Sequence, residues 1–267
     1  MKFKIRHSTT YTYTVPVFLE PHLIRLCPLS DPRQRLLSLE LTVSPQPTGV
    51  SHNIDADNNP FHLVWFSDLT TEFTLECWSL VETLNSNPFD SFLTCNDRLP
   101  LKLSDDETTL LGPCLDRYSL IGPGDAELIK SLCREVEALG GGSVLSTLQA
   151  LNFYLFEYVE KTTRHDRGLQ SVGTTLMTAQ GACRDTTLVF MAACRSWGIP
   201  ARFVSGCQEG DPDQAEGELH AWAEVYLPGF GWLGYDPTHG LAVADRQVSN
   251  ASSALPEQAA PDTGSFR

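Results

Sequence analysis

Residues 185–197 are apolar on almost every face of the helix that their spacing predicts, and this segment constrains the fold more than any other. Leu188 and Met191 follow the three-and-four spacing of a helix, and most positions between them are also apolar. Gly198 provides a C-terminal cap, and Pro200 stops any continuation of the helix. A helix without a polar face must be covered on all sides, so we expect it to be the central element of its domain.

A thiol lies at the start of this predicted helix. Cys183 follows Gln180 and the flexible Gly181, which places its sulfur at the first helical turn. The N–H groups of that turn have no partner within the helix and carry about half a positive charge, so they stabilise a thiolate or an oxyanion. Gln180 is a second candidate donor to the oxyanion, although a loop glutamine more often faces water. A lone cysteine is usually a small buried hydrophobe, and we interpret the other seven cysteines in that way.

Residues 220–236 have the pattern of a β-hairpin. Residues 220–227 form the first strand, Pro and Gly in residues 228–231 form a turn, and a short return strand ends at Asp236. Antiparallel pairing places His220, at the start of the first strand, beside Asp236 at the end of the second. Taken alone, a strand histidine is usually structural and an aspartate before proline usually forms a turn. Together they offer a base and the carboxylate that orients it.

The same hairpin carries two candidate substrate-binding residues. Trp222 lies on the outgoing strand and Trp232 on the returning strand, where they can line a groove beside the histidine. Packing in the core is an equally good explanation of both.

Cys183, His220 and Asp236 therefore occur in the order thiol, imidazole, carboxylate. A cysteine thiol is only a few per cent ionised at neutral pH, so a nucleophilic cysteine needs a neighbouring base. An imidazole can take the thiol proton, and a carboxylate can hold that imidazole in the required tautomer. The set predicts nucleophilic catalysis, provided that the three side chains meet in the fold.

Four ordered segments of the chain resemble the transglutaminase-like superfamily of papain-type cysteine enzymes. They are Gly181-Ala182-Cys183-Arg184-Asp185, residues 196–206, His220-Ala221-Trp222-Ala223-Glu224-Val225-Tyr226 and residues 231–238. The resemblance implies that Cys183 is the nucleophile, His220 the base and Asp236 the orienting carboxylate. Residues 5–13 and 21–26 are similar to the β-rich N-terminal region that accompanies bacterial members.

Two positions near the predicted site depart from the family pattern. Thr186 and Thr187 stand where the family often has Phe and Ala, and His239 stands where it usually has Asn. These departures bear on substrate preference.

Strand signals and helix signals divide the chain. Residues 1–84 contain several short alternating runs between turn residues and predict an antiparallel β domain. Residues 85–125 are mixed and predict a connecting region with short helical pieces. Residues 126–247 begin with two predicted helices and contain the candidate site. The resemblance implies a transglutaminase-like, papain-like core there, with the cysteine helix packed on an antiparallel sheet, so the class is α+β. Residues 248–267 are weakly hydrophobic, and we expect a weakly structured tail.

Composition excludes several classes of partner. The chain of 267 residues is 42% hydrophobic and carries a formal charge of −14, which argues against nucleic acid and anionic membranes as partners. No apolar run approaches the roughly 18 residues that span a bilayer. Residues 1–6 alternate charged and apolar side chains, unlike a signal peptide, so we expect a cytoplasmic location and reduced thiols.

The sequence thus favours an acyl-transfer enzyme that attacks a peptide or carboxamide bond through a thioester. Bacterial relatives favour a peptidase or amidase over a crosslinking transglutaminase, and we expect no cofactor and no resident metal. Two alternatives stay open: a catalytically silent binding module with the same fold, and a zinc site made of Cys183, His220 and Asp236. Residues 209–218 form an acidic loop before His220, which we expect to affect specificity. Oligomeric state is not predicted.

Overall fold

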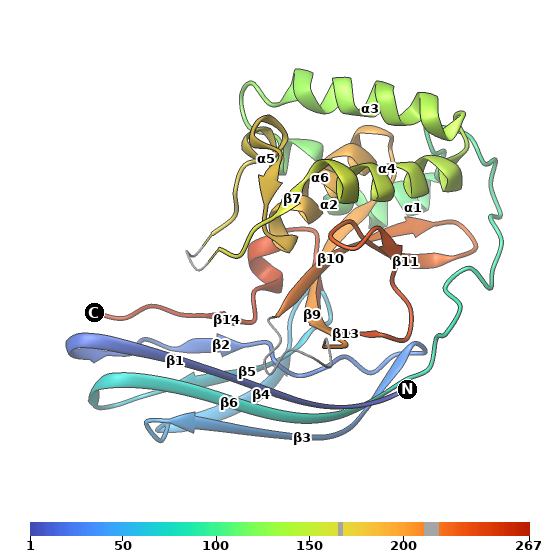
Figure 1. Ribbon diagram of the computed structural model, residues 1–267. Coiled ribbons are helices and arrows are strands. Elements are labelled where there is room, and N and C mark those ends of the chain that lie inside the picture. The colour runs from blue at the N-terminus through green and yellow to red at the C-terminus, as the bar shows by residue number, and fades with distance from the viewer. Residues whose placement is uncertain (165–167, 211–218) are drawn as a thin grey trace.

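The computed structural model describes residues 1–164, 168–210 and 219–267. Its first part is an antiparallel β-sandwich, and its second part packs helices on a separate sheet, one part lying above the other (Figure 1). A helix that begins at Cys183 packs on this second, antiparallel sheet, so the expected α+β class is confirmed. Most of the predicted acidic loop, residues 211–218, lies outside the described residues.

Two sheets form the N-terminal sandwich, with strand orders β1-β6-β3 and β14-β2-β5-β4. Side chains alternate between its interior and its surface, as a sheet with one solvent-exposed face requires. Phe73 and Leu75 from the first sheet pack with Val64 and Ile24 from the second in one apolar cluster. The strands are β1 (Lys2–Phe18), β2 (His22–Ile24), β3 (Gln34–Ser44), β4 (Gly49–Ile54), β5 (Pro60–Trp65), β6 (Leu69–Thr83) and β14 (Asp262–Thr263).

A five-stranded sheet of order β12-β11-β10-β9-β13 supports the helices of the second part. Its strands are β9 (Ala201–Gln208), β10 (His220–Leu227), β11 (Gly231–Asp236), β12 (Leu241–Ala242) and β13 (Gln247–Ser253). The main helices are α3 (Ala126–Gly140), α4 (Val144–Tyr158), α5 (Val172–Thr178) and α6 (Cys183–Ser196). Strands β7 (Glu160–Lys161) and β8 (Gln180–Gly181) form a short parallel pair.

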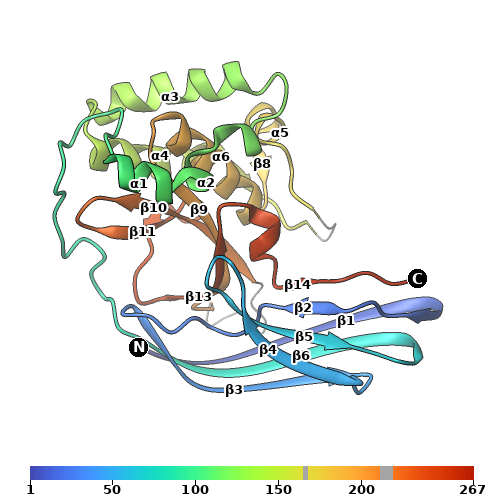
Figure 2. The same ribbon diagram turned by 180° about the vertical axis from the view of Figure 1, so that it is seen from behind.

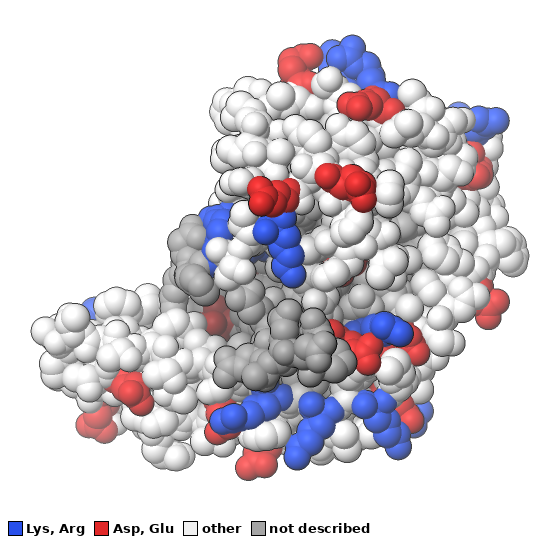
Figure 3. Space-filling view, viewed as in Figure 1, with Lys and Arg blue, Asp and Glu red and all other residues white. Residues whose placement is uncertain are grey.

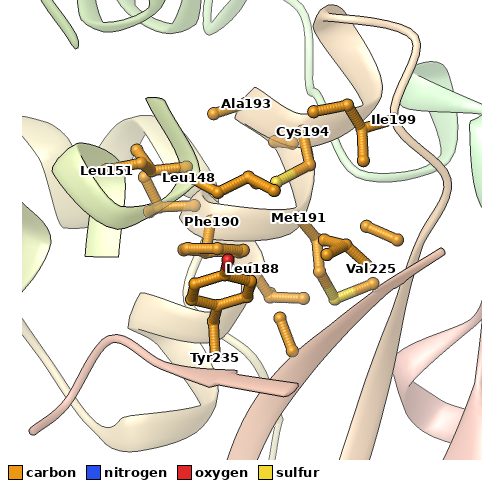
Figure 4. Close-up of a cluster of buried hydrophobic side chains, with 14 of the residues drawn as sticks. Leu148, Leu151, Leu188, Phe190, Met191, Ala193, Cys194, Ile199, Val225 and Tyr235 are labelled. Atoms are coloured by element: carbon orange, nitrogen blue, oxygen red, sulfur yellow. The ribbon is translucent and has the colours of Figure 1, made fainter. Parts of the chain in front are cut away.

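Helix α6 is the central element that its sequence predicted. Every residue from Asp185 to Arg195 is buried, because α3, α4, α5 and the sheet surround the helix. Phe190 of α6 stacks on Tyr235 of β11 with ring centroids 5.5 Å apart, and Leu148 and Leu151 of α4 lie in the same cluster (Figure 4). This packing fixes the first turn of α6 relative to the hairpin β10–β11.

An extended segment, residues 84–104, joins the two parts and carries no helix or strand. It is held against the second part: Asp97 accepts hydrogen bonds from the Ser143 hydroxyl and the Val144 N–H at the start of α4, at 2.8 and 2.7 Å. The short helices α1 (Asp105–Leu110), α2 (Gly112–Leu115) and η1 (Arg117–Ser119) follow. The domain boundaries predicted from the sequence, after residues 84, 125 and 247, remain predictions.

The expectation of a weakly structured tail over residues 248–267 is wrong. Strand β13 pairs with β9 at the edge of the second sheet, and η2 (Pro256–Ala259) and β14 follow. Ala251 and Ser252 are buried, and the Ser252 N–H donates to the Asn59 side chain at 2.8 Å. Strand pairing and polar contacts hold this segment in place, so a low hydrophobicity did not mean a lack of structure here.

Acidic and basic side chains are interspersed on the face shown in Figure 3 rather than gathered into one large patch of either sign. Among the helices in the described ranges, none combines the length and the hydrophobicity needed to cross a membrane.

Candidate active site

Cys183 begins helix α6, and the buried carboxylate of Asp185 fixes the backbone just before it. The carboxylate accepts hydrogen bonds from the Ala182 N–H at 3.0 Å, the Gln170 N–H at 2.8 Å and the Arg164 guanidinium at 2.6 Å. Asp185 is fully buried, and its negative charge is stabilised by the positive end of the α6 helix dipole. The entry of the chain into α6, and with it the position of the sulfur, is therefore determined by this carboxylate.

The hairpin brings the imidazole and the carboxylate together as its turn position predicted. His220 Nε2 lies 2.7 Å from Asp236 Oδ2, and both side chains are buried. The Thr238 N–H donates to the other carboxylate oxygen, Oδ1, at 3.0 Å, and Nδ1 of His239 lies 3.0 Å from Oδ2. With Nε2 committed to Asp236, Nδ1 of His220 is the nitrogen left for the thiol.

Electrostatic interactions favour the charged forms of both His220 and Asp236. Burial lowers the pKa of His220, but its hydrogen bonds to Asp236 and Cys183 outweigh burial and raise the pKa to about 9. Burial raises the pKa of Asp236, but its hydrogen bonds to His220 and His239 outweigh burial and lower the pKa to about 2. An imidazolium beside a carboxylate is thus the stable pair at neutral pH.

Cys183 and His220 both line one cavity of about 500 Å³ between the two parts of the molecule. The thiol is partly exposed there and close enough to affect the His220 pKa through a hydrogen bond. Apolar residues line much of the cavity, and they include Leu169, Phe203, Leu219 and Ala221. The segment after η2 also contributes to the lining. A partly exposed thiol at a helix start, hydrogen-bonded to an imidazole, can attack an electrophilic carbonyl carbon in this cavity.

The three predicted substrate-binding side chains lie elsewhere. Trp222 is fully buried, and the Trp232 ring lies 4.1 Å from the Arg202 guanidinium, away from the cavity. The Gln180 side-chain amide is exposed and donates to Glu160 at 2.9 Å. Every second residue of a strand points to the same face of the sheet. The sequence pattern alone does not say which of the two faces meets the substrate. The backbone N–H at the start of α6 is left as the candidate oxyanion donor.

Sequence reasoning placed His239 near the site without its contact to Asp236, and it missed Tyr11 and Asp262. His239 shares the Asp236 carboxylate, and Tyr11 and Asp262 line the cavity from the first strand and from the C-terminal segment. Of these three residues, only His239 gave a local signal in the sequence, because it stands where the family usually has Asn. Tyr11 and Asp262 are 251 residues apart, and no local pattern connects them.

Among the residues that the structure describes, His220, Asp236 and His239 are the group whose ligand atoms lie close enough to hold one metal ion, all within 4.8 Å of one another. Cys183 is not in that group, so a zinc site made of Cys183, His220 and Asp236 is not supported.

Comparisons with known proteins agree with this architecture. Residues 3–82 match the model of the bacterial transglutaminase-like N-terminal region, and residues 131–237 match that of the transglutaminase-like superfamily. An uncharacterized protein of Mycobacterium leprae is 26% identical over 254 residues, which cover 93% of this chain and 87% of the relative.

Two further similarities differ in extent. A protein-glutamine gamma-glutamyltransferase of Pseudomonas aeruginosa is 33% identical over 117 residues, 41% of this chain and 17% of that enzyme. The solved structure of a candidate cysteine protease from Cytophaga hutchinsonii has a TM-score of 0.71 at 21% identity, covering 100% of this chain and 88% of that one, and shows a shared fold. Both parts of the fold and both family models lead to one conclusion: the chain belongs to the transglutaminase-like superfamily, a family of cysteine-based enzymes.

Proposed function

We propose that the protein is a cysteine-nucleophile acyl-transfer enzyme that acts on a peptide or carboxamide bond and releases its product by hydrolysis. The observation that carries the proposal is that Cys183 and His220 line one cavity and interact there, while the buried Asp236 carboxylate lies 2.7 Å from the His220 imidazole. The relative named as a protein-glutamine gamma-glutamyltransferase supports a carboxamide as one acyl donor.

The geometry supports a two-step reaction. The Cys183 thiol gives its proton to His220, and the sulfur attacks the carbonyl carbon, whose electron pair moves to the oxygen. The N–H groups of the first turn of α6 stabilise that oxyanion. The C–N bond breaks, the leaving amine takes the proton from His220, and a thioester forms. His220 then takes a proton from water, the hydroxide attacks the thioester, and the returned proton restores the Cys183 thiol.

Asp236 holds the imidazole in position throughout this reaction. Its carboxylate accepts from His220 Nε2, which leaves Nδ1 to exchange protons with the sulfur and the leaving amine. Asp236 itself stays ionised, in agreement with its pKa of about 2.

Selective alkylation tests the nucleophile. We expect Cys183 of the folded protein to react with iodoacetamide near neutral pH at least about 10-fold faster than a free thiol, because His220 can take the thiol proton as the sulfur attacks. Intact-mass measurement follows the rate, and Cys183→Ala removes the fast phase. Cys114→Ala is the matched control, because Cys114 is also partly exposed but burial raises the pKa of its thiol. Equal rates for Cys183 and a free thiol would contradict the proposal.

The product separates hydrolysis from crosslinking. A glutamine-containing peptide incubated with a fluorescent primary amine yields ammonia in either reaction, but only crosslinking attaches the amine to the peptide. We expect glutamate as the product, and attachment of the amine in most turnovers would contradict the hydrolytic outcome.

A further inference from the structure

A segment from the far end of the chain forms one wall of the cavity that holds Cys183. After β13, η2 packs below the helices, and the chain then runs along β2 of the sandwich (Figures 1 and 2). We call residues 256–264 the C-terminal wall, because most of them line the cavity together with Cys183 and His220. The substrate must therefore fit between the catalytic helix and the C-terminal wall.

Charge is distributed unequally around this cavity. On the side of α6, Arg164 binds Asp185, and Arg184 donates to the backbone carbonyl oxygens of Gly168 and Arg164 at 3.1 and 3.3 Å. The C-terminal wall contributes the carboxylates of Glu257 and Asp262 to the same cavity. The arginines hold local structure around the first turn of α6, whereas the carboxylates belong to the C-terminal wall.

A hydrogen bond holds the Asp262 carboxylate in place and leaves it able to accept further hydrogen bonds. Both of its oxygens lie within hydrogen-bond distance of the Tyr11 hydroxyl, at 2.9 and 3.0 Å. That hydroxyl supplies one proton, while an ionised carboxylate has about four lone-pair sites. Tyr11 is itself fixed on the sandwich, stacked on Phe73 with ring centroids 5.9 Å apart. Asp262 is only partly buried, so it keeps accepting capacity on the side that lines the cavity.

We propose that Asp262 is a specificity-determining residue that binds a primary ammonium group of the substrate in the cavity that it shares with Cys183. The inference rests on the proposed acyl-transfer function and adds its substrate class: a peptide or amide with an apolar body and a cationic amine near the scissile carbonyl. The apolar lining receives the body, and the anchored carboxylate receives the amine. An α-amine and a lysine side chain share this chemistry, and the experiment separates them.

Three dipeptidyl chloromethyl ketones provide the test, since alkylation of the Cys183 sulfur expels chloride and is counted by intact mass. N-acetyl-norleucyl-alanine carries no charge, norleucyl-alanine carries a free α-amine, and N-acetyl-lysyl-alanine carries a side-chain amine. We expect at least one cationic probe to label Cys183 about 10-fold faster than the neutral probe, as a charge-assisted hydrogen bond predicts. The faster of the two cationic probes identifies the amine.

Asp262→Asn should abolish this preference, so that the cationic and neutral probes label Cys183 at similar rates within the variant. The asparagine oxygen still accepts from the Tyr11 hydroxyl, which preserves the wall. Glu20→Gln is the matched control: it removes one negative charge from the same part of the molecule, where Glu20 pairs with Arg267 outside the cavity. It should keep the preference.

A measurement on the unmodified protein makes the test independent of the variants. The preference for the cationic probe should shrink at about 1 M salt, where the Debye length falls to about 3 Å. Equal rates for charged and neutral probes in the unmodified protein, or an unchanged preference in Asp262→Asn, would overturn the inference. If Cys183 fails to react rapidly with iodoacetamide, the proposed function fails instead.

Discussion

Two imidazoles share one carboxylate oxygen of Asp236. His220 Nε2 lies 2.7 Å from Oδ2 and His239 Nδ1 lies 3.0 Å from it, and the two rings meet edge to face with centroids 5.2 Å apart. His220 is buried, whereas about a third of the His239 side chain is exposed. The carboxylate therefore connects the proposed base to a second imidazole that solvent can reach.

The pH dependence of activity should follow the charge of His220. Because its pKa is raised from 6.5 to about 9, the imidazolium persists at neutral pH and is lost as pH rises through about 9. Asp236→Asn removes the negative charge that helps to raise this pKa, so the alkaline limit of activity should move to lower pH. Turnover should also fall about 10²-fold, because the base is no longer oriented. Hydrolysis of a chromogenic peptide amide across the alkaline range measures both effects.

His239→Asn is the control for this prediction. It keeps the Asp236 carboxylate and restores the residue that the family usually has, so the alkaline limit should stay near its original pH. If Asp236→Asn leaves that limit in place, another group than His220 governs it.

At the scale of elements, the first turn of α6 depends on the buried Asp185. Asp185→Ala removes the acceptor of two backbone N–H groups and leaves Arg164, whose side chain is 20% exposed, without this ion pair. We expect a loss of about 3 kcal/mol in the free energy of unfolding, the lower end for a broken buried pair because Arg164 reaches solvent. Urea denaturation measures the loss.

Lys130→Ala is the matched surface variant. It breaks the pair between Lys130 and Glu127 on α3, where both side chains are mostly exposed, and should cost no more than about 0.5 kcal/mol. Similar losses in the two variants would show that the buried carboxylate does not anchor the helix.

Elements with strong local periodicity were predictable from the sequence. The apolar positions of α6 and the turn between β10 and β11 define their own structure, so Cys183, His220 and Asp236 were placed on the right elements. The direction in which Trp222 and Trp232 point depends on which face of the sheet the helices cover, and this is tertiary information. The cytoplasmic location stays a prediction.

The C-terminal segment shows the limit of that approach. Strand β13 is stabilised by pairing with β9 and by polar contacts to the sandwich, such as the Gln34 side chain bound to the backbone of Ser249. Neither partner is near in sequence. A run of Ser and Ala therefore lacks a local signal even where the fold buries it.

At the scale of the whole molecule, Glu224 joins the two parts. This buried carboxylate binds Arg202 from the neighbouring strand β9 and Arg33 from the N-terminal part. Burial raises the pKa of Glu224, but the two guanidinium groups outweigh burial and hold the pKa below its ordinary value. The stabilisation is thus present above the ordinary glutamate range and is lost as pH falls below it.

Glu224→Ala should destabilise the protein by about 3–5 kcal/mol, because it leaves two guanidinium groups together without their shared carboxylate. Chemical denaturation followed at several wavelengths measures the free energy of unfolding. Lys2→Ala, which breaks the exposed pair between Lys2 and Glu82, should cost less than about 1 kcal/mol. A loss below 1 kcal/mol for Glu224→Ala would mean that this junction contributes little to stability.

The return of the chain to its first sheet has a consequence for proteolysis. Residues 89–92 are largely exposed, so a protease can nick the chain between the two parts. Strand β14 would still pair with β2, and Arg33 would still hold Glu224, so the two fragments should elute together from a sizing column and separate only in denaturant. Fragments produced separately should also reassemble on mixing, because the β2–β14 pairing and the contact between Arg33 and Glu224 both form between them.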